Sequence, residues 1–240
     1  MLRVLAVGPG QLGLVELATS LQLAKGTVHG ILRTLYDIGF VEQDQRTGKY
    51  HLGAALLHLG TSYLDANELR SRAINWADAL ASRSGEAVRI GTLLEGKVLV
   101  VHHVFRPDDS LQTIEIGVLL PPHACALGKA LLAYNSGPWV AAHPRRESYT
   151  HRTLVSTADL TKAFHDVRDC GWASEVEELS IGVAGVAAPI RRHGGQVVGS
   201  IGVTGSIDRL CDRGRHIRGD LVTQVQDAAR SVSRELGSPR

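Results

Sequence analysis

The hydrophobic pattern of the chain changes character near residue 60. Up to about Leu59, apolar residues mark short helices and one pair of short alternating runs, whereas from about Glu86 strands alternate with helices. Between these parts, residues 65–85 carry apolar residues at helical spacing and end at Gly85. The pattern predicts a module of residues 1–60, a linker helix of residues 61–84 and a larger domain of residues 85–240.

Two helices joined by a tight turn are predicted in the first module. The apolar face of the first helix consists of Leu14, Leu17, Ala18 and Leu21. The positions of the second helix that are expected to pack inward are Val28, Ile31, Leu32 and Leu35. The opposite side of that helix carries short polar and cationic residues next to glycines, and an α-helix of this kind fits the major groove of DNA. We expect four of these side chains to contact bases and phosphates: Lys25, Thr27, His29 and Arg33.

A short basic hairpin is predicted directly after the second helix. The runs "FVEQ" and "KYHL" alternate like strands, and the turn "DQRTG" between them carries Arg46, with Lys49 beside it. A small solvated domain with scattered charges is the alternative interpretation of any one of these residues. The combination of two helices, a turn and a basic hairpin favours a DNA-binding module in which Arg46 and Lys49 contact phosphate.

Composition and charge add little to this picture. With 240 residues, 44% hydrophobic content, a net charge of +2 and a pI near 8.5, the chain is an ordinary globular protein, and any DNA-binding argument must be local. Cys125, Cys170 and Cys211 lack CxxC spacing and are interpreted as free thiols of a reducing compartment. No run is long enough to span a membrane, and "MLRVLAVGPG" is too short for a signal peptide, so we expect a cytoplasmic protein without membrane contact.

The larger domain is predicted to hold a mostly antiparallel sheet with helices. One strand pair turns at Glu95 and Gly96, and a second pair, "GVAAPI" and "QVVGSIGVTG", flanks "RRHGG". Helices are expected over "ALGKALLAY" and from a capping box at Ser156 and Asp159 through Val167. A final helix is indicated by the apolar stripe Leu221, Val225, Ala228, Val232 and Leu236.

Several polar groups of this domain suggest a ligand pocket. The loop before "ALGKALLAY" leaves the backbone N–H groups of Ala126 and Leu127 available to a ligand, with His123 nearby. Glu175 precedes a glycine-rich turn, and Gly202 and Thr204 share one face of a strand. The alternative is that the glycines mark bulges and that Glu175 is a surface carboxylate.

The sequence favours a binding protein over an enzyme. It has no GxSxG, HExxH, Walker or GxGxxG motif, and Glu175, Glu177 and Glu178 alone do not form a catalytic arrangement, so no catalytic residue and no cofactor is predicted. His102 and His103 point to opposite faces of a strand and are interpreted as core or pocket residues, so no metal site is predicted either. A metabolite sensor that acts through protein contacts, or a small-molecule enzyme, remains the alternative, but neither explains the basic hairpin.

The segments "LAKGTVHGILRTL", "GFVEQD" and "YHLG" resemble the IclR family of bacterial transcriptional regulators, and within it those of actinomycete glycerol operons. The resemblance covers almost the whole chain. It implies an α+β protein in which a winged helix-turn-helix is joined by a helix to a GAF-like mixed α/β effector domain. It also implies a longer first helix, with a native start upstream of Met1. Many relatives have an arginine at the position of Gly30, so the base contacts of that arginine are expected to fall to the neighbours of Gly30.

The same resemblance implies partners. They are double-stranded operator DNA, bound by a homodimer that can pair into a tetramer, and a small effector, with glycerol 3-phosphate first among polyols and organic acids. The function implied is repression of a glycerol or related catabolic operon. The positions that match effector contacts in the family are Ala126, Leu127, Glu175, Gly185, Gly202 and Thr204.

Overall fold

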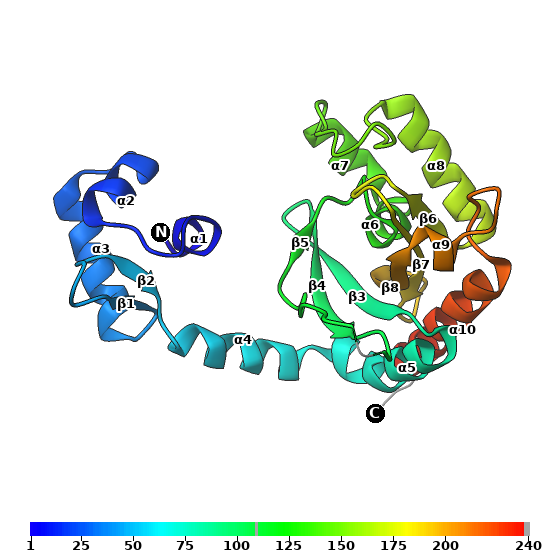
Figure 1. Ribbon diagram of the computed structural model, residues 1–240, viewed down its shortest axis with the longest axis horizontal. Coiled ribbons are helices and arrows are strands. Elements are labelled where there is room, and N and C mark those ends of the chain that lie inside the picture. Colours follow the sequence, from blue (N-terminus) through cyan, green and yellow to red (C-terminus); the bar gives the residue numbers. More distant parts are fainter. Residues whose placement is uncertain (109, 238–240) are drawn as a thin grey trace. The chain divides into compact units, whose positions relative to one another are not determined.

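The computed structural model describes residues 1–108 and 110–237 (Figure 1). The chain divides into two compact units, Met1–Ala66 and Asn67–Arg240. Among the helices of the described residues, none combines the length and the apolar character needed to cross a membrane. The two units are called the front unit and the rear unit below.

The front unit is a small helical domain with one hairpin. Its elements are α1 (Leu2–Val7), α2 (Leu14–Leu21), α3 (Lys25–Asp37), β1 (Val41–Gln43), β2 (Tyr50–Leu52) and α4 (Ala55–Ala66). The strands β1 and β2 pair in antiparallel fashion. Buried apolar side chains from α1, α2, α3 and the hairpin form one core: Leu5, Leu17, Ala18, Val28, Leu32, Val41 and Tyr50. The predicted helix-turn-helix and hairpin are therefore present.

One inward-facing position of α3 differs from the expectation. Val28 and Leu32 are fully buried, but Ile31 is 37% exposed. Successive residues of an α-helix are about 100° apart, so Ile31 lies at the edge of the stripe that Val28 and Leu32 define. The prediction that all four apolar residues pack inward is therefore wrong for Ile31.

The rear unit is built on one sheet of six strands. The strand order is β5-β4-β3-β8-β7-β6, and every neighbouring pair is antiparallel. The strands are β3 (Ala87–Leu94), β4 (Lys97–Val104), β5 (Leu119–Leu120), β6 (Ala173–Val176), β7 (Val183–Arg191) and β8 (Val197–Ser206). The predicted antiparallel sheet is confirmed, with β5 and β6 as additional edge strands.

Helices cover both faces of this sheet. α5 (Glu68–Ser84) and α10 (Gly219–Gly237) pack against each other and against β3, β7 and β8, while α6 (Ala126–Leu132) lies across β3, β6, β7 and β8 (Figure 1). α8 (Thr157–Cys170) packs on α6. Two short helices, α7 (Ser136–Ala142) and α9 (Ile207–Leu210), complete the unit. All five residues of the predicted α10 stripe are buried.

The predicted linker helix is divided in two. α4 ends at Ala66 and α5 begins at Glu68, because the side chain of Asn67 accepts a hydrogen bond from the backbone N–H of Arg70 and caps a new helix. α5 ends at Gly85, whose φ of 68° is the left-handed conformation typical of a glycine at a helix end.

Candidate DNA-binding surface and effector cavity

The outer face of α3 presents the predicted DNA-contacting residues to solvent. Leu23 N–H donates to the carbonyl oxygen of Ala18 at 3.0 Å, which closes the turn between α2 and α3. All four predicted side chains of α3 are exposed: Lys25, Thr27, His29 and Arg33. A methyl group at Gly30 would meet no atom within 4 Å, so another backbone can approach the helix closely there. This face suits insertion into a major groove.

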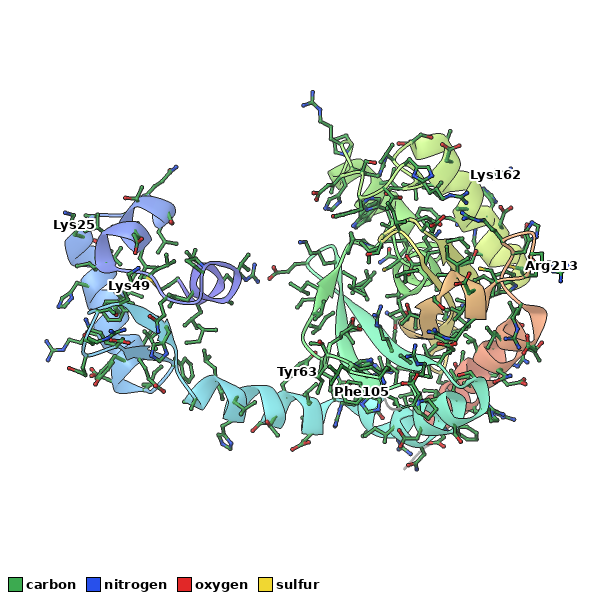
Figure 2. All side chains as sticks on the ribbon, viewed as in Figure 1. Lys25, Lys49, Tyr63, Phe105, Lys162 and Arg213 are labelled. Carbon is green, nitrogen blue, oxygen red and sulfur yellow. The ribbon has the colours of Figure 1, made fainter. Side chains whose placement is uncertain are left out.

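The hairpin turn is held in shape by one carboxylate. Asp44 Oδ1 accepts hydrogen bonds from the backbone N–H groups of Arg46 and Thr47, both at 2.8 Å. These two bonds hold the pKa of the Asp44 carboxyl below its usual range. The Gly48 N–H donates to the Asp44 carbonyl oxygen at 2.8 Å. The turn thus orders its backbone while Arg46 stays exposed and Lys49 is half-buried (Figure 2 labels Lys25 and Lys49).

Two acidic side chains of the front unit accept hydrogen bonds from the backbone. Glu16 Oε2 accepts from Gly13 N–H at 2.6 Å, and Glu42 Oε1 accepts from Ala54 N–H at 3.1 Å. Within the described residues, no ion pair involves the cations of the outer face and the hairpin, Lys25, Arg33, Arg46 and Lys49. Their charges are therefore available to an external anion such as DNA phosphate.

The rear unit brings most of the predicted effector residues around one small cavity between α6 and the sheet. Strand register explains this convergence: Glu175 pairs with Gly185, Gly185 with Thr204, and Gly202 with Arg89. Six of the seven predicted residues line the cavity: Ala126, Leu127, Glu175, Gly185, Gly202 and Thr204. Its volume is about 10 Å³, roughly the room of one water molecule. We call it the closed cavity.

Glu175 is the most perturbed group of the closed cavity. Only 5% of the residue is exposed, and Oε2 has no hydrogen-bond partner. Burial raises the pKa of this carboxyl to about 7, a rise that Glu178 adds to and that Lys129 and Arg89 oppose. The absence of a side chain at Gly185 makes room for it, because a methyl group there would lie 3.1 Å from Glu175 Oε1. Glu175 is therefore a buried carboxyl group with one oxygen, Oε2, that lacks a partner among the described residues, and not a surface carboxylate.

Two wall residues were not predicted from the sequence. Arg89 on β3 lines the closed cavity and is the only basic residue among the described residues that line it. Cys125 precedes α6, and its Sγ accepts from Gly128 N–H at 3.4 Å. Burial raises the pKa of the Cys125 thiol to about 12, so it is a packed, protonated thiol. An arginine within the apolar run "AVRIG" is the sequence signal that could have identified Arg89.

His123 does not line the closed cavity, unlike the expectation. Its Nε2 lies 2.9 Å from the carbonyl oxygen of Glu147, and its ring packs near Trp139 and Tyr149. His102 is buried on β4, and burial lowers the pKa of His102 and of the neighbouring His103. Across residues 1–108 and 110–237, no group of three or more histidine, cysteine or carboxylate side chains is arranged to hold a metal ion.

Comparison with known proteins agrees with this architecture. The IclR helix-turn-helix domain model matches residues 1–45, and the model of the bacterial transcriptional regulator IclR C-terminal domain matches residues 61–234. The chain is 51% identical over 241 residues to the glycerol operon regulatory protein of Streptomyces coelicolor, with 100% of this chain and 94% of that protein covered.

Solved structures show the same fold. The IclR transcriptional regulator of Alicyclobacillus acidocaldarius matches with a TM-score of 0.83 at 24% identity, covering 98% of this chain and 95% of that one. An IclR homolog of Microbacterium hydrocarbonoxydans, solved with 4-hydroxybenzoate, matches with a TM-score of 0.77 at 18% identity, covering 98% and 96%.

The helix-turn-helix domain and the C-terminal domain that these models match, together with the relative of 51% identity, define a transcriptional regulator with a DNA-binding domain, and not an enzyme. The chain belongs to the IclR family of bacterial transcriptional regulators, whose members bind operator DNA and small-molecule effectors.

Proposed function

We propose that this chain represses a glycerol or related catabolic operon in the cytoplasm and that a small polyol phosphate, glycerol 3-phosphate first, controls its binding to the operator. The observation that carries the choice of operon is the 51% identity to a glycerol operon regulatory protein across the whole chain. The units of residues 1–66 and 67–240 divide the work, with DNA contact in the front unit and effector contact in the rear unit.

The DNA contacts are assigned to two elements of the front unit. Lys25, Thr27, His29 and Arg33 on α3 enter the major groove, where cationic and hydroxyl side chains read base edges. Arg46 and Lys49 on the hairpin neutralise phosphates. The support for this assignment is that five of these six residues are exposed and Lys49 is half-buried, and that within the described structure none of the four lysines and arginines forms an ion pair.

The effector contacts are assigned to the closed cavity. Glu175 and Thr204 carry oxygen atoms that suit ligand hydroxyl groups, and Ala126 and Leu127 contribute backbone at the start of α6. A cavity of about 10 Å³ cannot hold a three-carbon ligand, so binding must widen it. A ligand that favours the widened cavity shifts the protein toward that conformation, which is the requirement for control of DNA binding.

A homodimer is part of the proposal, and α4 is the element that supports it. α4 has apolar residues along one side, yet none of its residues is buried, and Leu57 is 75% exposed. An amphipathic helix gains stability by burying its apolar face. A second copy of α4 supplies such a surface, and a dimer doubles the number of DNA contacts.

The test titrates glycerol, glycerol 3-phosphate, pyruvate and glyoxylate into a complex of the full chain with DNA from upstream of its own gene and the neighbouring genes. Fluorescence anisotropy of the labelled DNA reports release. Glycerol 3-phosphate is expected to change DNA affinity at the lowest concentration. If pyruvate or glyoxylate releases the DNA and neither polyol does, the assignment of the effector is wrong, while the role as a regulator stands.

A further inference from the structure

An open groove adjoins the closed cavity. It has a volume of about 420 Å³ and shares two lining residues with the closed cavity, Arg89 and Thr204. The remaining charged residues of its lining are Arg106, Glu115 and Arg209. Because the two spaces share a wall, a ligand that widens the closed cavity at Arg89 extends into the groove.

Two of the three arginines in this groove are held by carboxylates from outside its lining. Arg209 forms a two-point contact with the buried carboxylate of Glu86, from Nε at 2.6 Å and Nη2 at 3.1 Å. Arg106 contacts Asp108 through Nε and donates from Nη2 to Ser110 Oγ at 2.7 Å. Among the described residues, neither guanidinium forms a hydrogen bond or an ion pair with a residue that lines the closed cavity.

Arg89 has a different kind of partner. Its Nη2 donates to Glu115 Oε1 at 2.7 Å, and its Nε forms an ion pair with Glu115 Oε2. Glu115 lies in residues 110–118, which contain no helix or strand. The groove residue His103 accepts from the Glu115 backbone N–H at 3.3 Å. The Arg89 guanidinium, which lines the closed cavity, thus binds the carboxylate of Glu115, a residue of the loop 110–118.

We propose that Arg89 is the anion subsite of the effector site and that Glu115 occupies the place that the phosphate group of a phosphate monoester takes when it binds. A guanidinium and a phosphate form a planar, two-point contact that is stronger for a dianion than for a carboxylate. This inference rests on the proposed function of the closed cavity as the effector site, and it adds the chemical group that the site selects.

The electrostatics of the two spaces orient the ligand. Glu175 lies inside the closed cavity and disfavours a phosphate group there, whereas Arg89 lies where the closed cavity meets the groove. The phosphate end therefore points to Arg89 and the hydroxyl end to Glu175 and Thr204. The start of α6 is less suitable for the phosphate, because the Gly128 N–H is already bonded to Cys125 Sγ and His123 lies outside the cavity.

Release of Glu115 has a structural consequence. The loop is tied at both sides, by Gln112 to the backbone of Arg106 and by Gly117 N–H to the Val100 carbonyl oxygen at 2.8 Å. Between these ties, Glu115 is the residue that joins the loop to Arg89. Phosphate binding should therefore increase backbone hydrogen exchange within residues 112–117, which links occupancy of the site to a change in the loop.

Isothermal titration of the full chain with glycerol 3-phosphate, glycerol and inorganic phosphate tests the proposal. Arg89→Gln should weaken glycerol 3-phosphate binding about tenfold to a hundredfold, while glycerol binding changes less than about threefold. Glu115→Gln removes the competing carboxylate and should tighten glycerol 3-phosphate binding. Arg192→Gln and Glu68→Gln, which break a surface pair of the same unit with an N–O distance of 3.2 Å, are matched controls.

Each outcome decides the matter. An equal loss of affinity for glycerol and glycerol 3-phosphate in Arg89→Gln, or weaker glycerol 3-phosphate binding in Glu115→Gln, overturns the subsite. Glycerol 3-phosphate could fail to bind the wild type. In that case the subsite is supported, and the proposed effector rejected, if inorganic phosphate binds Glu115→Gln and if adding Arg89→Lys to this variant weakens that binding. No binding of any phosphate probe to the wild type or Glu115→Gln rejects the subsite. If Arg89→Gln does not fold, Glu115→Gln and Arg89→Lys carry the test.

Discussion

Replacing Glu175 by glutamine should stabilise the rear unit above pH 7 and leave it nearly unchanged at pH 4. The folded protein raises the pKa of this carboxyl from 4.5 to about 7, chiefly by burial. Between these two values the folded state holds a proton that the unfolded state has lost, so stability falls as the pH rises through this window and then levels off. A glutamine stays neutral at every pH and removes the fall.

The structure sets the size of this effect. The pKa difference of about 2.5, from 4.5 to about 7, corresponds to ~3 kcal/mol at roughly 1.4 kcal/mol per pH unit. We expect a gain of up to about 3 kcal/mol at pH 8, a figure that already includes the favourable interaction of the charged carboxylate with Lys129. Burial of this charge in the closed cavity thus lowers the stability of the protein at neutral pH.

The assay is urea unfolding at pH 4, 5, 6, 7 and 8, followed by tryptophan fluorescence. The three tryptophans, Trp76, Trp139 and Trp172, all belong to the rear unit, so the signal reports this unit alone. Glu68→Gln, at a half-buried glutamate of the same unit that pairs with Arg192 on the surface, controls for the loss of one negative charge. A stability difference between wild type and Glu175→Gln that stays constant from pH 4 to pH 8 would refute the reasoning.

Three further predictions concern the DNA surface, the packing of the cavity and the dimer. Arg46→Ala and Lys49→Ala should each lower the salt slope of DNA binding by about 0.9, measured by anisotropy from 50 to 200 mM salt; an unchanged slope contradicts phosphate contact. Gly202→Ala should lower the urea midpoint, because its methyl group would lie 2.4 Å from a carbonyl oxygen of β7, whereas Gly219→Ala has open space and should not. Leu57→Asp should shift light-scattering mass toward the monomer, and an unchanged mass excludes α4 from the interface.

Local signals explain which elements could be predicted. The turn between β3 and β4 falls on Glu95 and Gly96, whose positive φ values of 48° and 78° match a two-residue hairpin turn. The α10 stripe is apolar at helical spacing from Leu221 to Leu236 and is buried along its length. In both cases the residues that determine the element are neighbours in the sequence.

Long-range pairing explains what could not be predicted. Arg89 reaches the closed cavity only because β3 pairs with β8 and α6 crosses the same face of the sheet. No short sequence pattern predicts this strand pairing or the position of α6. β6, which carries Glu175, is too short to show a period. His123 lies near Ala126 in the sequence, yet its hydrogen bond to Glu147 holds it outside the cavity.

The central claim is that α3 and the hairpin bind DNA, and one comparison tests it most directly. The variant Lys25→Ala/Arg33→Ala/Arg46→Ala is compared with Arg145→Ala/Lys162→Ala/Arg213→Ala, three exposed cations of the rear unit (Figure 2 labels Lys162 and Arg213). Anisotropy of labelled upstream DNA at one salt concentration gives both affinities, and circular dichroism checks folding. The first variant should lose about a hundredfold or more in affinity and the second less than about threefold. Wild-type affinity in a folded first variant would contradict the claim.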